Sequence, residues 1–196
     1  FFSIVQTPKK KKPLFKSMTV MRRLVEDLIS RMGEQLPNNH IRLVFLINQY
    51  DQILSIVKER NTNLDEFHVF QHMLDKEVRA FVTQQLLRFF PTLVKALKMA
   101  SSLTPPTSPS AAPRSAAQPP PADAMRAPVS LDQNQAADVI RDFNANWKGS
   151  IDKMQGEVLT LFTNFRTGGS ILEEALAQLA LYYGRFSDIV KAEFKN

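Results

Sequence analysis

The stretch FTNFRTGGSIL, Phe162 to Leu172, holds the residues whose types and spacing most suggest chemistry in this chain. Glycines before a serine that opens a helix can leave backbone N–H groups free, here at Ser170–Leu172, and Arg166 would add a positive charge for an anion. A phosphate-binding loop, however, requires a preceding strand and the pattern G-x-x-x-x-G-K-[ST]. The segment before Phe162 has helical spacing and the lysine is missing, so a nucleotide site is disfavoured.

The same stretch has a structural interpretation as a corner between two helices. Gly168 and Gly169 can adopt left-handed backbone conformations at no steric cost, as a helix C-terminus often requires. Ser170 stands three residues before Glu173, in the S-x-x-E order of a capping box that opens a helix. Because each residue then has a local structural role, we predict a helix–corner–helix arrangement here and not an anion site.

One set of residues has the spacing of metal ligands. His68, His72 and Asp75 follow one another at i, i+4 and i+7, which places all three on one face of a helix. That face lies beside an apolar stripe and continues into Arg79, as an ordinary solvated surface does. We therefore expect no metal here.

The remaining candidates for catalysis are weak. Glu173 and Glu174 are adjacent, so on a helix their carboxylates diverge by about 100° and do not readily share a substrate. No nucleophile elbow, triad-like cluster or cysteine is present. The sequence predicts a protein that is not an enzyme and that needs no cofactor.

The net charge of +6 is concentrated at the start of the chain. Residues 1–42 carry nine basic and three acidic side chains, and the rest of the chain is balanced. Four of the basic residues, Lys9–Lys12, lie between two prolines, so we interpret residues 1–16 as a basic, flexible, solvated segment. A contact with an anionic membrane or an acidic partner is the alternative. A nucleic-acid domain would spread its basic residues over a folded face, so no nucleic acid is expected.

Prolines divide the chain. Eight of the twelve fall between Pro105 and Pro128, and proline removes backbone donors and disfavours helix. We predict a Pro/Ala/Ser-rich disordered linker over residues 101–130. It separates an N-terminal helical part at 17–100 from a C-terminal helical hairpin at 131–196, which we expect to pack together as one bundle.

Apolar residues recur at helical spacing in both parts, and no alternating strand pattern is present. Helices are predicted at about 17–36, 40–60, 64–90 and 91–100, with two more after the linker, so the fold class is all-α. In the first helix, Val20, Leu24, Leu28 and Met32 form the expected apolar stripe. The helix at 40–60 is apolar around so much of its surface that it should be buried. The longest apolar runs hold about five residues against the roughly 20 that span a bilayer, so no membrane span is expected.

Two blocks of sequence resemble a known family. They are LVFLINQYDQILSIVKER (Leu43–Arg60) and WKGSIDKMQGEVLTLFTNFRTGGSILEEALAQLALYYGRF (Trp147–Phe186). Their most specific pieces are FLIN-x-YD, the Trp-Lys pair before a long helix, FTNFR-x-G-x-SI and YY-x-RF. These pieces are similar, in order and spacing, to the C-terminal region of the vacuolar protein sorting fifty-two family. The proline-rich linker and the PKKKKP run are not features of that family.

The resemblance implies a non-catalytic subunit of a vesicle tether, the Golgi-associated retrograde protein complex or its endosomal relative. It implies an elongated, rod-like helical bundle of the multisubunit-tethering type. The implied partners are sister subunits, Golgi Rab GTPases and SNARE proteins. The implied location is peripheral, on the cytoplasmic face of the trans-Golgi network and endosomes, in retrograde transport.

Surface residues near the family motifs are our candidates for protein binding: Tyr182, Tyr183, Lys148, Arg166 and Arg185. Adjacent Tyr182 and Tyr183 cannot both face the core, so at least one is available to a partner. Two alternatives to the family assignment stay open. One is a subunit of a related tether such as the exocyst, and the other is a basic helical protein that binds nucleic acid or an anionic membrane.

Overall fold

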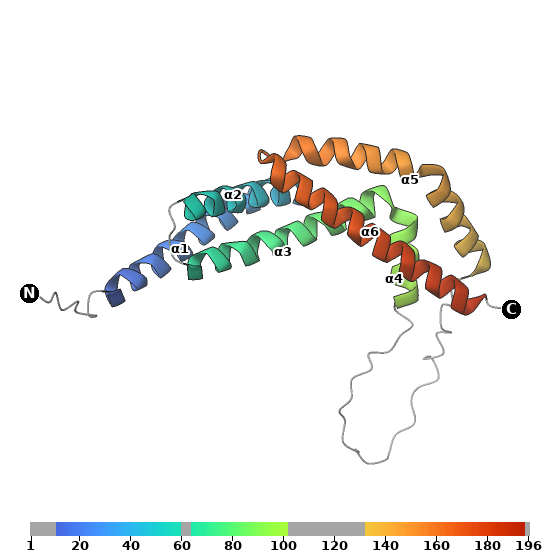
Figure 1. The fold of residues 1–196 in the computed structure, drawn as a ribbon, viewed down its shortest axis with the longest axis horizontal. Coiled ribbons are helices and arrows are strands. Elements are labelled where there is room, and N and C mark those ends of the chain that lie inside the picture. The colour runs from blue at the N-terminus through green and yellow to red at the C-terminus, as the bar shows by residue number, and fades with distance from the viewer. Residues whose placement is uncertain (1–10, 60–63, 102–131, 195–196) are drawn as a thin grey trace, which may run out of the picture. The chain divides into compact units, whose positions relative to one another are not determined.

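The computed structural model describes residues 11–59, 64–101 and 132–194, and all of their regular structure is helical (Figure 1). The all-α prediction is therefore confirmed for these residues. The helices are α1 (Lys11–Glu34), α2 (Asn39–Glu59), α3 (Leu64–Phe89), α4 (Pro91–Ser101), α5 (Gln133–Leu161) and α6 (Phe165–Glu193).

Two predicted segments fall largely outside the described residues. The predicted linker at 101–130 does so except for Ser101, which ends α4. Of the basic segment at 1–16, residues 1–10 lie outside, whereas α1 already begins at Lys11, six residues before the expected Ser17. Pro13 lies in the first turn of this helix, where a missing backbone donor costs little.

Local signals set the helix ends at two described positions. Asn38 caps α2, since its side-chain Oδ1 accepts a hydrogen bond from the backbone N–H of Ile41 at 2.9 Å. Pro91 has no N–H and therefore separates α3 from α4, as the sequence predicts, while the backbone N–H of Phe90 still bonds to Leu86 O at 2.8 Å.

The chain forms two compact units, and each draws on both parts of the sequence that flank residues 102–131. Unit 1 holds residues 1–84 and 157–172, and unit 2 holds residues 85–156 and 173–196. The boundaries between the units therefore fall inside α3, α5 and α6 and differ from the sequence-based division at the linker.

The core of unit 1 is built around α2. Phe81 from α3 is fully buried, and the Phe162 ring meets it edge-on with the two centroids 5.2 Å apart. The His40 ring stacks on Phe81 at 5.5 Å. The predicted burial of the 40–60 helix is confirmed by five buried side chains: Leu43, Leu46, Ile47, Tyr50 and Leu54.

The core of unit 2 combines α4 with parts of α3, α5 and α6. Its aromatic centre is a ladder in which Phe143 lies 5.8 Å from Phe90 and 4.8 Å from Tyr183 between ring centroids. Stacked and tilted rings at such distances stabilise a core beyond simple burial. The buried side chains of this unit include Leu86, Leu93, Val94, Leu97, Val139, Met154, Ala175, Leu179 and Phe186.

The apolar stripe of α1 lies on its exposed side. The helix buries Ile29 and Gly33, whereas the expected stripe of Val20, Leu24, Leu28 and Met32 is 48–65% exposed. Gly33 explains the choice, because a Cβ there would come within 3.3 Å of Leu46 Cδ2 on α2. The small residue lets α1 approach α2 closely along that side, which turns the apolar stripe away from the core.

Among the described residues, none of the helices combines the length and the apolar character that a membrane crossing requires.

Candidate functional site: a protein-binding surface

The corner between α5 and α6 lies at Phe162–Asn164, earlier than the glycines suggested. Asn164 caps α6, because its Oδ1 accepts the N–H of Arg166 at 3.1 Å and its backbone carbonyl accepts the N–H of Gly168 at 3.0 Å. Gly169 and Ser170 therefore lie within the helix. The predicted Ser170–Glu173 capping box is wrong.

The glycines do not have the role that the sequence suggested. Neither Gly168 nor Gly169 has a left-handed backbone conformation, since both belong to the first turns of α6. The N–H groups of Ser170–Leu172 come after the first turn of α6. Beyond that turn, each backbone N–H bonds to the carbonyl four residues before it. These N–H groups are therefore not free to bind an anion, in agreement with the prediction of a helix corner in place of an anion site.

Asn48 of α2 makes four hydrogen bonds, and three of them hold the corner. Its amide nitrogen donates to the carbonyls of Val44 and Leu161, at 3.0 and 3.2 Å. Its amide oxygen accepts from both the backbone N–H and the hydroxyl of Thr163, at 3.1 and 3.2 Å. One side chain thus satisfies a carbonyl at the end of α5 and an N–H in the corner.

Asp51, one turn further along α2, completes the same arrangement. One carboxylate oxygen accepts from the Asn164 amide at 3.0 Å, and the other accepts from the Thr167 hydroxyl at 2.7 Å. The FLIN-x-YD and FTNFR motifs therefore contact each other within unit 1. Their polar residues are used to fix a helix corner and do not form a reactive site.

The set of His68, His72 and Asp75 lies on the surface of α3. His68 and His72 are exposed on α3, and the Asp75 carboxylate accepts a hydrogen bond from the Gln71 amide at 2.8 Å. Within the described residues, no group of three or more His, Asp or Glu side chains is placed to hold a metal ion. His40, which the sequence left without a role, stacks on Phe81 and lies 3.4 Å from a Glu157 carboxylate oxygen through Nε2.

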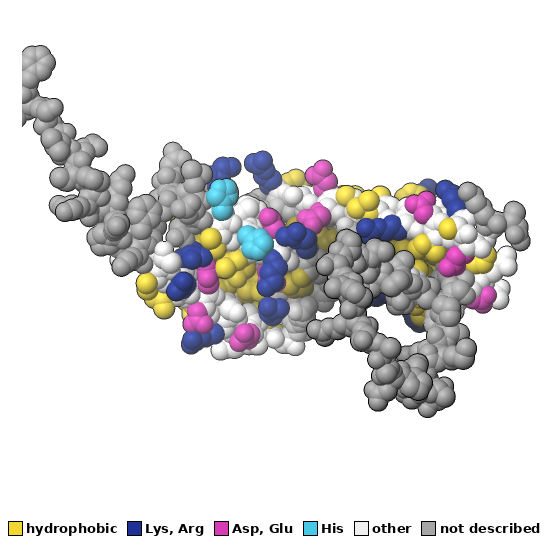
Figure 2. All heavy atoms as spheres, turned by 90° about the horizontal axis from the view of Figure 1, so that it is seen from below, with side chains coloured by type: hydrophobic (Ala, Val, Ile, Leu, Met, Phe, Trp, Pro, Cys, Tyr) yellow, Lys and Arg dark blue, Asp and Glu magenta, His cyan; other side chains and the backbone are white. Residues whose placement is uncertain are grey.

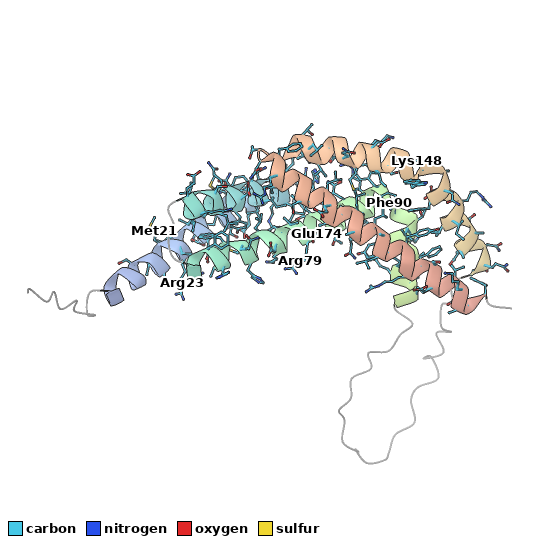
Figure 3. The ribbon with its side chains drawn as sticks, in the orientation of Figure 1. Met21, Arg23, Arg79, Phe90, Lys148 and Glu174 are labelled. Atoms are coloured by element: carbon cyan, nitrogen blue, oxygen red, sulfur yellow. The ribbon has the colours of Figure 1, made fainter. Side chains whose placement is uncertain are left out.

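The feature of unit 1 that suggests binding is the outward side of α1. We name it the α1 face and define it by Val20, Met21, Leu24, Leu28 and Met32, each 48–65% exposed. Val20, Leu24, Leu28 and Met32 recur every four residues and therefore follow one side of the helix, and Met21 borders them. Met21 and Arg23 are labelled on this helix in Figure 3.

The α1 face continues into a shallow apolar groove. Met21 is shared by both, and the groove is lined further by Arg22, Val25, Ile53, Ile56, Val57 and Phe70 from α1, α2 and α3. Large side chains that are exposed one by one are ordinary, but a contiguous apolar area on a protein marks an interaction surface. Figure 2 shows hydrophobic side chains gathered between charged ones on the face of the molecule that it draws.

The five predicted binding residues are divided between the units. Arg166 is exposed at the start of α6 in unit 1. In unit 2, Lys148 lies over the Trp147 ring at 5.4 Å and is exposed, as is Arg185. Tyr183 is 42% exposed although its ring stacks on Phe143, and Tyr182 is half-buried. Their role in binding stays a prediction.

Comparison with known proteins gives one consistent family. Over 172 residues, 87% of its length, the chain is 30% identical to vacuolar protein sorting-associated protein 52 A of Arabidopsis thaliana and covers 22% of that protein. It is 30% identical over 167 residues, 85% of the chain, to the human homolog of protein 52, of which it covers 21%. The homolog of Caenorhabditis elegans is 26% identical over 167 residues, with 85% of the chain and 21% of that protein covered.

The described residues are helical, and the polar residues Asn48 and Asp51 of the first motif fix a helix corner of the second. Over most of its length the chain is homologous to these proteins, which are named vacuolar protein sorting-associated protein 52, and this confirms the resemblance seen in the motifs. The chain spans about a fifth of the length of the curated relatives it matches. No family model and no solved structure matches it.

Proposed function

We propose that this chain is a non-catalytic part of a vesicle-tethering subunit that acts in retrograde transport from endosomes to the trans-Golgi network. The relatives are named for vacuolar protein sorting, which supports a role in protein transport. The structural observation that supports work through protein contacts is the α1 face. A helix that turns five large apolar side chains outward gains stability when another helix covers them.

The proposed partners are sister subunits of a Golgi-associated retrograde tethering complex, a Golgi Rab GTPase and SNARE proteins. The proposed location is peripheral, on the cytoplasmic face of the trans-Golgi network and endosomes, through the complex. Several modest interfaces held in one complex would together give avidity, since each later contact benefits from a high effective concentration. Tyr182, Tyr183, Lys148, Arg166 and Arg185 remain candidate contacts outside the α1 face.

The test is affinity capture of the tagged full-length protein from cells, with the recovered proteins identified by mass spectrometry. We expect sister tethering subunits with the wild-type protein and a loss of at least one of them with Leu24→Glu/Leu28→Glu. The matched control is Leu87→Glu/Leu181→Glu, which changes two helix leucines of 44% and 58% exposure elsewhere. Because all four leucines are exposed, neither double variant should change the free energy of unfolding by more than about 0.5 kcal/mol per site.

Two results would contradict the proposal. Recovery of exocyst subunits in place of Golgi tethering subunits would assign the chain to a different tether. Equal recovery of every partner with the α1-face variant and with the control would show that the α1 face is not a contact surface, even if the family role holds.

A further inference from the structure

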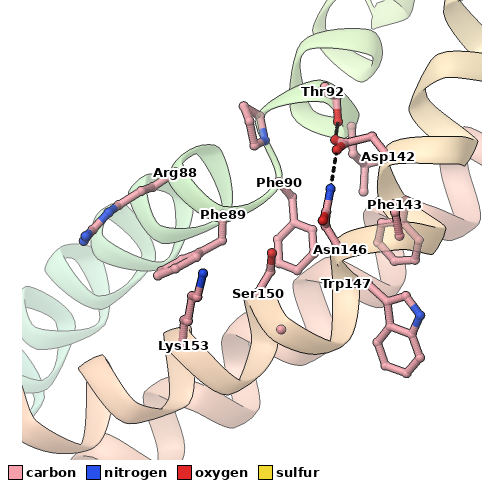
Figure 4. A pocket seen from close by; sticks show the side chains of 14 residues that line it. Arg88, Phe89, Phe90, Thr92, Asp142, Phe143, Asn146, Trp147, Ser150 and Lys153 are labelled. Atoms are coloured by element: carbon pink, nitrogen blue, oxygen red, sulfur yellow. Dashed lines mark hydrogen bonds between the residues drawn. The ribbon is translucent and has the colours of Figure 1, made fainter.

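Unit 2 contains a slot of about 410 Å³ between the end of α3, the start of α4 and the middle of α5 (Figure 4). We call it the α5 slot. Small residues on the α5 side keep it open, namely Ala145, Gly149 and Ser150. At Gly149, no atom lies within 4 Å of the position that a Cβ would take. The volume is within the range of about 300–1,000 Å³ that is usual for ligand sites.

One end of the α5 slot is closed by a fixed carboxylate. The Thr92 hydroxyl donates to Asp142 Oδ2 at 2.5 Å, and the Asn146 amide donates to Asp142 Oδ1 at 2.7 Å. Figure 4 shows these two side chains on either side of Asp142. The Thr92 hydrogen bond ties α4 to α5, and the two bonds together hold the negative charge in place.

The other end carries positive charge. Lys153 and Arg88 line it, and the Arg88 guanidinium lies 5.3 Å from the centre of the Phe89 ring. Lys153 has no ion-pair partner among the residues that the structure describes. In Figure 4 the Lys153 side chain points from α5 toward the side of the slot that carries Phe89. An acidic group at this end would meet a cation that the chain itself leaves unpaired.

Aromatic surface connects the two ends. Phe89, Phe90 and Pro91 line the side formed by α3 and α4, and Phe143 and Trp147 line the α5 side. Phe90 is buried and gives a rigid floor, whereas Trp147 is 37% exposed at the rim. Apolar side chains next to a few fixed polar groups are typical of concave ligand sites.

We propose that the α5 slot binds an extended segment of a partner protein in which an acidic residue lies next to an apolar one. The acidic side chain pairs with Lys153, and its apolar neighbour packs on Phe89. Asp142 at the opposite end disfavours a continuous polyanion, because its fixed negative charge would face the next phosphate. This inference rests on unit 2 alone and does not depend on the α1 face.

The experiment selects peptides of roughly twelve residues from a random displayed library on the wild-type chain. Peptides that also bind a Gly149→Leu variant are removed, because this substitution fills the slot without changing any charge. Gly156→Leu is the matched control, since Gly156 also lies in α5, has no atom within 4 Å of a Cβ position and is not part of the slot. Helicity measured by circular dichroism checks that both variants fold alike.

We expect the selected peptides to be enriched in Asp or Glu beside aromatic or aliphatic residues. Trp147 is the only tryptophan of the chain, so its fluorescence reports binding at the rim directly. A selected peptide should produce a saturable change whose affinity weakens roughly tenfold or more in Lys153→Glu and in Gly149→Leu, but not in Gly156→Leu. The affinity should also fall with added salt, as expected for a charge pair at a surface.

Three results would overturn the proposal. One is a selection with no acidic enrichment. The second is a Trp147 response that is the same in Gly149→Leu as in the wild type. The third is stronger binding of single-stranded oligonucleotides or vesicles containing phosphatidylserine than of the selected peptide, with the same dependence on Lys153. Because none of these readouts involves tethering partners, their failure leaves the proposed function untouched, and the reverse also holds.

Discussion

The two units use their polar side chains in different ways. In unit 1, Asn48 makes three hydrogen bonds to the α5–α6 corner and Asp51 makes two, and these five bonds fix the corner onto α2. In unit 2, the polar residues of the α5 slot border open space, and the side chain of Gln85 is buried with no partner for its amide among the described residues. The hydrogen-bonded residues of the corner are therefore tests of stability, whereas the α5 slot, with Lys153 at one end, is the place to test for binding.

The largest effect is expected at Asn48. Asn48→Ala leaves the Leu161 carbonyl and the Thr163 N–H without their partner, so the free energy of unfolding should fall by about 2 kcal/mol. Urea denaturation followed by circular dichroism measures this. Asn146→Ala is the matched control in unit 2, because Asn146 is exposed and bonds only to Asp142 on the same helix. If both substitutions have the same effect, the contrast between the units is wrong.

Substitution of Gln85 in unit 2 should change the free energy of unfolding in the opposite direction. Its side chain is 1% exposed, and neither amide atom has a hydrogen-bond partner in the described structure. An unpaired buried amide is costly, so the similarly shaped Gln85→Met should raise the free energy of unfolding by about 1 kcal/mol. The same urea experiment measures it. A fall of similar size would show that the amide is in fact paired in the folded protein.

The cap of α6 distinguishes the structure from the sequence-based expectation. Asn164→Ala removes the side-chain cap of the helix and should cost about 1 kcal/mol, whereas Ser170→Ala lies inside the helix and should cost less than about 0.5 kcal/mol. Thermal and urea unfolding of the two variants measures the difference. The reverse order would restore the Ser170 capping box.

Gly169→Ala tests the same point independently. In a helix, alanine is favoured over glycine by about 0.5–1 kcal/mol, and a Cβ at Gly169 meets no atom within 4 Å. The variant should therefore be more stable than the wild type in the same urea titration. A glycine with a left-handed backbone would give a loss instead.

The smallest effect concerns Tyr50 in unit 1. Burial raises the pKa of its phenol above 10.0, and the nearby carboxylates of Glu77 and Glu26 raise the pKa further. Tyr50 therefore ionises at a lower pH in the unfolded chain than in the folded one. It adds no pH dependence below its unfolded pKa of about 10, and the free energy of unfolding falls as the pH rises from there through the folded pKa. Tyr50→Phe should reduce this alkaline loss. In the Tyr50→Phe variant, absorbance at tyrosinate wavelengths should lose the ionisation step that the wild type shows above pH 10.0. A titration that is unchanged from the wild type would contradict the raised pKa.

Much of the fold could be predicted from local signals. The helix type, the Pro91 break and the burial of α2 follow from spacing and from proline chemistry, which act over a few residues. The direction of α1 could not be predicted, because the choice depends on how closely Gly33 approaches Leu46 on another helix. A periodic stripe shows that a helix has an apolar side but does not show which neighbour covers it.

The corner shows the same limit at the candidate site. Two caps compete in FTNFRTGGS, and the local pattern favours Ser170, whereas the structure uses Asn164. Asn164 prevails because its amide also bonds to Asp51, a residue that lies 113 positions earlier in the chain. The family motifs were visible in the sequence, but their mutual contact was not. The α5 slot likewise depends on three helices meeting and has no motif of its own.

The pairing of Asn48 and Asp51 with Thr163–Thr167 has a consequence for synthesis. Residues separated by 113 to 116 positions must meet before unit 1 is complete. At ribosomal rates of about 5–20 residues per second, α2 waits on the order of ten seconds for the segment that closes it. During that interval Phe162 is not yet available to cover the apolar surface around Phe81. Newly made chains should therefore depend on chaperones more than the finished protein does.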